Sequence, residues 1–234
     1  MMAQQQRLDV LANNLANVNT RGFKADSLTF SDMLVRSMAD EAGNGGVIGV
    51  LASGPAVDKQ TTDFSQGGVE VTGNNLDCSL GGAGMFAVQT SAGVRYTRDG
   101  AFTLNATGGL VTRNGDAVLD TDGKPITGIN GRVVIEKDGS IHLSDKKETI
   151  ATIGRFNGTF TKDANGKNLF EAANAVAFGA KEGPSVDAGQ LESANIEPVS
   201  LMVQMIALQR AYEISQKMVQ SQDDSTAKLN EVMA

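Results

Sequence analysis

Few residues of this 234-residue chain have side chains suited to acid–base, nucleophilic or metal chemistry. The one histidine, His142, lies in the alternating run Ser140-Ile141-His142-Leu143. We expect an ordinary half-exposed strand side chain there, since no neighbouring carboxylate or nucleophile pattern supports catalysis. The one cysteine, Cys78, lies midway between Leu76 and Leu80, so we expect a buried, small apolar residue. One cysteine excludes an intrachain disulfide, and together with one histidine it excludes a zinc site of these ligands.

Two loops partly match ligand-binding motifs. Asp120-Thr121-Asp122-Gly123 begins like a calcium loop but continues as Lys124-Pro125 without the final glutamate, so it predicts a turn. Gly81-Gly82-Ala83-Gly84 opens a strand and lacks the lysine of a phosphate loop, so we expect only close backbone packing. The sequence therefore predicts no catalytic residue, no cofactor, no metal site and no enzymatic activity. A polysaccharide-acting enzyme stays as a rival, because the spacing of a carboxylate pair cannot be found from sequence.

The two ends of the chain are predicted to be helices with apolar residues at alternating spacings of three and four. The first helix is expected to end near Gly22, a residue suited to a left-handed C-cap. Pro198 is expected to begin the second helix, which would reach Met233 and measure roughly 50 Å. So long an apolar seam needs a partner, and we predict that the two helices pair in a coiled-coil-like manner.

Three asparagines in the first helix are unusual for a solvated face. Asn13, Asn14 and Asn17 each lower helix propensity, and Glu, Lys or Gln would normally fill an exposed face. We predict polar contacts between packed helices, with a solvated face as the alternative. The predicted assembly interface comprises Leu8, Leu11, Asn13, Asn14, Leu15, Asn17, Val18, Leu201, Met205, Leu208, Tyr212, Val219 and Leu229.

The middle of the chain has the pattern of short antiparallel strands separated by Asx-Gly turns. The strands are predicted at 85–89, 93–97, 101–104, 133–136 and 140–143, and the turns at 99–100, 114–115, 122–123, 138–139 and 165–166. Before this zone, residues 31–38 suggest one or two helical turns, and 43–46 should break any regular element. The predicted fold class is mixed and mainly β, an antiparallel β domain flanked by the terminal helices.

Four segments follow from these patterns. Residues 1–38 form the N-terminal helix and adjoining segment, 39–66 a Gly-rich connector or extended arm, 67–190 the β domain and 191–234 the C-terminal helix. The net charge of −7 without a Lys/Arg cluster excludes the electrostatic footprint of a nucleic-acid binder. No apolar run is long enough to cross a membrane, and the polar first twenty residues do not resemble a signal peptide.

Three blocks of this sequence resemble the bacterial flagellar basal-body rod and hook proteins. The first is the segment 8–24, LDVLANNLANVNTRGFK. The second is 96–104, YTRDGAFTL, followed by 109–112 and 114–115. The third is 191–198, LESANIEP, with 209–213, QRAYE. The three blocks keep their order along the chain, and the resemblance covers nearly everything outside residues 40–60.

The resemblance implies a structural axial subunit of the flagellar rod, located in the basal body. It implies that the terminal helices form an inner, tube-forming domain and that subunits polymerise helically and transmit torque. The implied partners are other rod subunits and the flagellar type III export apparatus, with neither nucleic acid nor membrane insertion. Length favours a rod component over the hook and over the shortest rod proteins. We expect the proximal rod protein, with the distal rod or hook-type protein as the alternative and a secreted β-rich adhesin or coat protein as the rival class. Relatives carry about a dozen further residues before the equivalent of Met2, so we expect either a truncation or a misplaced start there.

Overall fold

The computed structural model describes residues 2–39, 47–144, 146–163, 168–179 and 183–233. Two compact units are present. We call residues 1–16, 26–61 and 197–234 the terminal-helix unit, and residues 17–25 and 62–196 the β unit. Each unit is assembled from segments far apart in the sequence.

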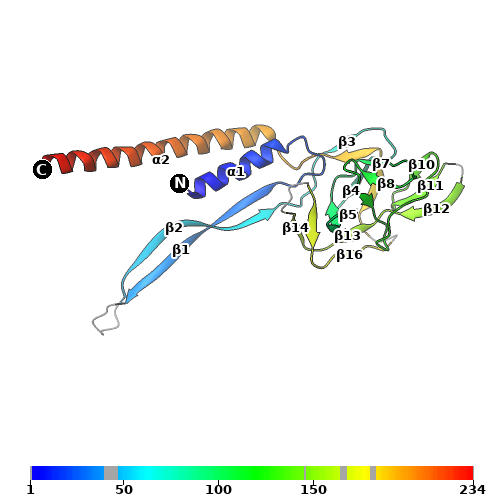
Figure 1. The fold of residues 1–234 in the computed structure, drawn as a ribbon, viewed down its shortest axis with the longest axis horizontal. Coiled ribbons are helices and arrows are strands. Elements are labelled where there is room, and N and C mark those ends of the chain that lie inside the picture. The colour runs from blue at the N-terminus through cyan, green and yellow to red at the C-terminus, as the bar shows by residue number, and fades with distance from the viewer. Residues whose placement is uncertain (1, 40–46, 145, 164–167, 180–182, 234) are drawn as a thin grey trace. The chain divides into compact units, whose positions relative to one another are not determined.

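The terminal-helix unit contains two helices and a two-stranded sheet (Figure 1). Its elements are α1 Met2–Ala16, β1 Asp26–Ala39, β2 Val47–Thr62 and α2 Pro198–Met233. α1 contacts both α2 and β1. At 1.5 Å per residue, the 36-residue α2 is about 54 Å long and the 15-residue α1 about 23 Å. The longer helix therefore extends well past the length that α1 can cover.

The predicted helical turns at 31–38 are wrong, because these residues belong to the strand β1, which pairs with β2. A short apolar run fits a strand as well as a helix, and a 16-residue partner strand decides the outcome here. β2 lies within the predicted connector or arm at 39–66. The predicted Gly-rich break at 43–46 lies outside the described residues, as does the turn at 165–166.

The β unit holds the remaining strands, all paired in antiparallel sheets. The strands are β3 Val69–Val71, β4 Cys78–Gly81, β5 Met85–Thr90, β6 Gly93–Thr97, β7 Phe102–Leu104, β8 Leu110–Thr112, β9 Ala117–Val118, β10 Val133–Ile135, β11 Ser140–Leu143, β12 Lys146–Thr152, β13 Arg155–Asn157, β14 Phe160–Lys162, β15 Phe170–Ala172, β16 Val176–Ala177, β17 Ser185–Ala188 and β18 Gln190–Glu192. The main sheet has the order β14-β15-β6-β5-β9-β8-β7, with β13 joining β5 and β16. Smaller sheets pair β10-β11-β12, β17-β4 and β18-β3.

Two predicted hairpin turns and one predicted connecting turn are confirmed. Gly115 and Gly139 both have positive φ angles and join β8 to β9 and β10 to β11. Asp120-Thr121-Asp122-Gly123 is a turn, in which the backbone N–H of Gly123 donates to the Asp120 carbonyl. Short-range signals were sufficient in these three cases, because the turn residues and the elements they join are adjacent in sequence.

The turn predicted at Asp99-Gly100 does not form a hairpin. β6, which precedes it, pairs with β5 and β15, whereas β7, which follows it, pairs with β8. Gly100 instead packs directly on the chain at Cys78, and an added Cβ would lie 1.7 Å from the Cys78 carbonyl oxygen. A long-range contact, rather than a turn, therefore requires glycine at this position.

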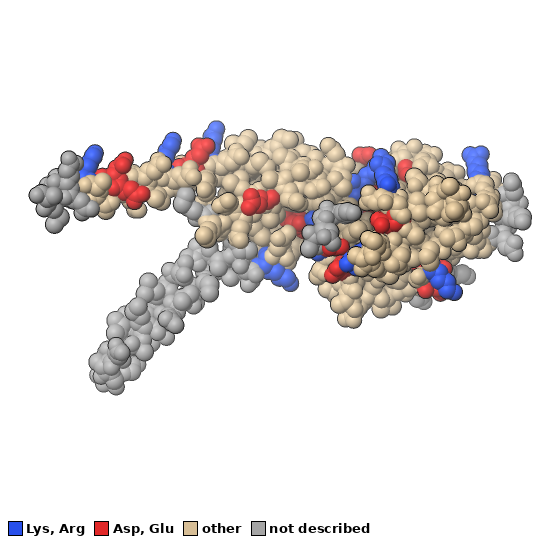
Figure 2. All heavy atoms as spheres, viewed as in Figure 1, with Lys and Arg blue, Asp and Glu red and all other residues tan. Residues whose placement is uncertain are grey.

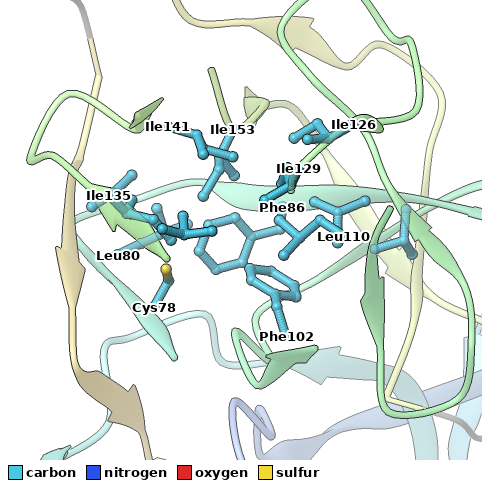
Figure 3. Packing of buried hydrophobic residues seen from close by; sticks show 14 of the residues in the cluster. Cys78, Leu80, Phe86, Phe102, Leu110, Ile126, Ile129, Ile135, Ile141 and Ile153 are labelled. Carbon is cyan, nitrogen blue, oxygen red and sulfur yellow. The ribbon is translucent and has the colours of Figure 1, made fainter. Parts of the chain in front are cut away.

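The core of the β unit lies among the sheets (Figure 3). Phe86 and Phe102 pack edge to face with ring centroids 5.2 Å apart, and Ile141 and Ile153 are fully buried near them. Cys78 is also fully buried, as predicted, and burial raises the pKa of its thiol to about 12. At neutral pH this cysteine is an unreactive neutral thiol that packs like a small apolar side chain.

Candidate functional site

In the terminal-helix unit, the predicted seam of α2 is its less exposed face. Leu201, Met205, Leu208 and Tyr212 are all half-buried at spacings of three and four, and α1 contacts α2. Val219 continues the same line but is 46% exposed. Leu229 lies in α2, and its side chain is outside the described part of the chain.

The predicted interface residues of the first segment divide between helix and turn. Leu8 and Leu15 are half-buried on α1, Leu11 is buried and Asn13 is exposed. α1 ends at Ala16, before the predicted end near Gly22, and turns follow it. Asn17 and Val18, both half-buried, therefore belong to the β unit and not to the helix.

Asn14 connects α1 to the start of β1. Its side-chain Nδ2 donates to the Asp26 carbonyl at 2.8 Å, and its Oδ1 accepts from the Asp26 backbone N–H at 3.0 Å. The residue is 3% exposed, so this amide substitutes for a strand partner in a buried place. Asn14 thus has a structural function inside the chain, while contacts of the three asparagines with a neighbouring subunit stay a prediction.

The opposite face of α2 carries a second apolar stripe. We call this the outer stripe, and its members are Val199, Met202, Val203, Ile206, Ile214 and Met218. Each member is between 49% and 70% exposed. Figure 2 shows Lys, Arg, Asp and Glu on the later part of α2, whereas residues 198–209 contain none. A helix that is apolar on two opposite faces buries only one of them against α1.

In the β unit, a buried cluster of charges joins the three sequence blocks that carry the family resemblance. The Glu192 carboxylate accepts hydrogen bonds from Lys24 Nζ and Arg98 Nε, each at 2.6 Å. Its Oε1 also accepts from the backbone N–H of Gly67 at 3.0 Å. The side chains of Lys24, Arg98 and Glu192 are 1%, 4% and 0% exposed. We call these three residues the charged cluster.

The pKa values within the charged cluster follow from burial and from its own charges. Burial raises the pKa of Glu192, but the charge of Arg98 and hydrogen bonds from Lys24 and Gly67 outweigh this and lower it overall. Burial lowers the pKa of Lys24, and the hydrogen bond to Glu192 opposes that effect. Glu192 is therefore a carboxylate at neutral pH, held by donors on three sides.

The loop Gly81-Gly82-Ala83-Gly84 holds the guanidinium of Arg98. Arg98 Nη2 donates to the carbonyls of Leu80 at 2.9 Å and Gly82 at 2.6 Å, and Nη1 donates to the Gly84 carbonyl. Gly82 and Gly84 both have positive φ angles, which turn their carbonyls toward the cation. The expectation of close backbone packing is thus confirmed in a specific form, because this loop presents carbonyls to a cation.

Further backbone contacts fix residues 17–25 within the β unit. The Gly22 N–H donates to the Glu192 carbonyl at 2.7 Å, and a Cβ on Gly22 would lie 2.5 Å from the Arg98 backbone. Asn195 Oδ1 accepts from the Ala25 N–H at 2.8 Å, and its Nδ2 donates to the Asp63 carbonyl at 2.9 Å. Gly22 has the predicted left-handed φ, but its function is this close approach and not the helix cap.

His142 is half-buried, as predicted, but the expectation that no carboxylate lies near it is wrong. Its Nε2 lies 3.0 Å from Ser140 Oγ and 3.8 Å from the Glu136 carboxylate. Ser140 Oγ also donates to Asp138 at 2.6 Å. The aspartate therefore contacts the serine, whereas in a catalytic triad the aspartate holds the histidine and the histidine contacts the serine.

The charged cluster was missed at the sequence level. Its members are separated by about 70 to 170 residues, since the hydrogen bond between Lys24 and Glu192 spans 168 positions and that between Arg98 and Glu192 spans 94. One signal was available, since each of the three lies inside one of the family-like blocks. A charged residue within each of three ordered motifs is a reason to test whether the three motifs meet.

Comparisons with known proteins agree with this organisation. Residues 1–24 match the model of the flagella basal body rod protein, residues 79–153 that of the flagellar hook protein FlgE/F/G D1 domain, and residues 187–232 that of the flagellar basal body rod FlgEFG protein C-terminal region. Lys24, Arg98 and Glu192 fall one in each matched region. Among the described residues, no helix is both long and apolar enough to span a membrane.

Individual relatives match along nearly the whole chain. The flagellar basal-body rod protein FlgF of Caulobacter vibrioides is 36% identical, over 98% of this chain and 91% of its own length. FlgG of Bacillus subtilis is 31% identical, over 96% and 92%. The relatives' names state no position along the rod, so the preference for the proximal rod stays a prediction, and the β-rich adhesin is not favoured. The chain belongs to the flagellar basal-body rod protein family.

Proposed function

We propose that this chain is a structural subunit of the flagellar rod that polymerises helically through its terminal-helix unit. The outer stripe of α2 is the observation that carries the proposal. Its members from Val199 to Ile206 lie in a stretch without charged residues, and an exposed apolar patch is typical of a surface that another molecule covers. Head-to-tail contacts through such a face do not close, so they generate helical filaments.

The length of α2 supports the same proposal. Every described side chain from Gln216 to Lys228 is exposed, including Val219 on the predicted seam. Helices in water gain most of their stability from packing, and an extended, solvated end gains little. Neighbouring subunits would supply this packing, both on the outer stripe and on the seam beyond the reach of α1.

The remaining parts of the proposal concern delivery and mechanics. We infer that the subunit is exported unfolded through the flagellar type III apparatus, assembles with other rod subunits at the proximal or distal rod, and transmits torque. A lone cysteine that forms no disulfide suits a chain that must pass through unfolded. The charged cluster and apolar core would then refold the β unit as a rigid outer part.

The test is a charge placed on the outer stripe. Ile206→Asp should reduce recovery of the subunit in purified basal bodies at least tenfold, because the interface would have to bury a carboxylate. Gln216→Asp, an exposed polar position of the same helix, adds the same charge and should assemble normally. Both variants should still be exported, and their monomers should melt like the wild type. Normal incorporation of Ile206→Asp would overturn the proposal.

A further inference from the structure

A small cavity of about 120 Å³ lies beside the charged cluster in the β unit. Lys24 and Arg98 contribute to its lining, together with the apolar side chains of Phe64, Met85 and Phe160. The Phe64 ring is packed against Phe160, with centroids 6.2 Å apart, and is 40% exposed. The cavity therefore combines two cations with aromatic and thioether walls, and it has room for a short side chain or several water molecules.

The charges around this cavity do not balance. The charged cluster contains two cations and one carboxylate, so it carries an excess of one positive charge in a buried place. The carboxylate of Asp63 attracts Lys24, but Asp63 is exposed and its carboxylate accepts hydrogen bonds from Ser65. Burial lowers the pKa of Lys24, and the neighbouring charge of Arg98 lowers it further. An additional anion would relieve both effects.

Unused hydrogen-bond donors accompany the excess charge. A lysine ammonium has three N–H donors, and Lys24 Nζ uses two, to Ser65 O and Glu192. An arginine has five, and Arg98 uses four, to Glu192 and the carbonyls of Leu80, Gly82 and Gly84. Among the described residues, one N–H of each cation thus remains without an acceptor.

We propose that this cavity binds a carboxylate on a short hydrocarbon stem. The carboxylate would accept hydrogen bonds from the remaining N–H groups of Lys24 and Arg98, and the stem would contact Phe64, Met85 and Phe160. An acidic side chain of a neighbouring subunit and a free short-chain acid share this chemistry. The inference concerns the β unit alone and does not depend on how α2 packs.

The direct test compares two probes of nearly equal shape on the full-length monomer. Propionate should cause saturable shifts of the backbone amide resonances of Gly84 and Gly158, which line the cavity. Propionamide, which lacks the charge, should bind at least tenfold more weakly. Sodium chloride at matched ionic strength is the reference. Equal binding of propionate and propionamide, or no shift with either, would overturn the proposal.

A pair of variants localises the binding. Ala83 lines the cavity and is exposed, so Ala83→Phe should fill it without removing any contact of the charged cluster. We expect at least a tenfold loss of propionate affinity. Ala92→Phe places the same ring on an exposed turn between β5 and β6 and should leave the affinity unchanged. Propionate binding that survives Ala83→Phe would contradict the assigned site.

The same pair identifies the source of the carboxylate. If an acidic side chain of a neighbouring subunit occupies the cavity, Ala83→Phe should also be recovered less in basal bodies than Ala92→Phe. If the two are incorporated equally while Ala83→Phe has lost propionate binding, the natural occupant is a free carboxylate. Both results keep the site, and they differ only in what fills it.

Discussion

The β unit and the terminal-helix unit differ in what they bury and in what they leave exposed. The β unit buries an apolar core and also a charged cluster, whose carboxylate accepts hydrogen bonds from both of its cations. The terminal-helix unit leaves an apolar stripe in solvent and extends a helix past its partner. The comparison shows that one unit has the features of a complete fold, whereas the other has those of a component completed by assembly.

Buried charge and exposed apolar surface are both costly, and each is informative about its unit. A buried ion pair adds little net stability compared with apolar packing, but removing one partner is strongly destabilising. The charged cluster thus makes the β unit intolerant of partial folding. Exposed apolar surface, in contrast, costs a monomer the hydrophobic free energy that burial against another molecule would recover. The charged cluster favours a rigid β unit, and the outer stripe favours polymerisation through the terminal-helix unit.

The largest expected effect comes from removing the shared carboxylate. Glu192→Ala leaves Lys24 and Arg98 buried without compensation, so it should lower the free energy of unfolding of the β unit by about 3–5 kcal/mol. Urea unfolding followed by near-UV circular dichroism measures this. The control is Glu171→Ala, whose carboxylate is 53% exposed and pairs with Arg95 at 2.7 Å. An exposed pair should contribute at most about 1 kcal/mol. Equal losses of unfolding free energy in the two variants would mean that the buried charged cluster contributes no more than an exposed ion pair.

A charge on the seam of α2 should affect the other unit. Leu208 is half-buried on the less exposed face of α2, and α1 contacts α2, so Leu208→Asp should destabilise the helix pair by about 2–3 kcal/mol. Helical signal at 222 nm in the monomer should fall while the β unit melts unchanged, and incorporation into basal bodies should fail. This separates the seam from the outer stripe, where Ile206→Asp should block incorporation without loss of helix. If Leu208→Asp leaves the helical signal unchanged and is incorporated normally, the seam and the outer stripe do not have the different roles assigned to them.

Replacement by alanine should change the stability of the monomer by different amounts at the neighbouring residues Asn13 and Asn14. Asn14→Ala leaves both polar groups of the buried Asp26 backbone without this partner, at a cost of about 1–3 kcal/mol. Asn13→Ala is on the exposed face of the same helix and should change stability by no more than about 0.7 kcal/mol. Thermal unfolding compares the two monomers. The predicted amide contacts between subunits are tested with Asn13→Ala and with a triple variant that also carries Asn14→Ala and Asn17→Ala. If both variants assemble normally at a temperature where their stability matches that of the wild type, these contacts do not exist.

The smallest effect is a pH dependence. The pKa of Glu192 is lowered below its ordinary value of 4.5, so its stabilisation is complete above that pH and is lost as the pH falls through the folded value. Burial raises the pKa of Asp99, which contributes in the opposite direction and complicates a single curve. The melting-temperature difference between the wild type and Glu192→Gln removes this complication. This difference in melting temperature should be constant from pH 5 to pH 7 and become smaller below pH 4.5. A difference that stays constant down to pH 3 would contradict the lowered pKa of Glu192.

Much of the fold was predictable where the signal is local. Asn114-Gly115 and Asp138-Gly139 join strands that are adjacent in sequence, and helical spacing predicted the seam from Leu201 to Tyr212. Asp99-Gly100 has the same dipeptide form, yet its glycine is required by a contact with Cys78. The run at 31–38 became a strand because of its partner β2. In both failures a distant segment determined the local structure, and no window of sequence contains that information.

The site was predictable only in part for the same reason. Periodicity predicted one face of α2, but a helix that is apolar on two faces gives no indication of which face is covered inside the chain. The outer stripe was therefore absent from the predicted interface. Lys24, Arg98 and Glu192 meet only after the β unit folds, so charge patterning in any one segment cannot predict the charged cluster. Asn14 was recognised as unusual, but its partner, the Asp26 backbone, was not.

Hydrogen exchange of the dilute monomer and of assembled rods tests the central claim most directly. In the monomer, amides of β5 at 85–90 should exchange only through global unfolding, while α2 amides at 216–228 should exchange within seconds. Limited proteolysis should then leave the β unit, residues 17–25 and 62–196, resistant to cleavage. In assembled rods, the same α2 amides should become protected at least a hundredfold. If residues 216–228 are as protected in the dilute monomer as those of β5, the terminal-helix unit is complete without neighbours and the account is wrong.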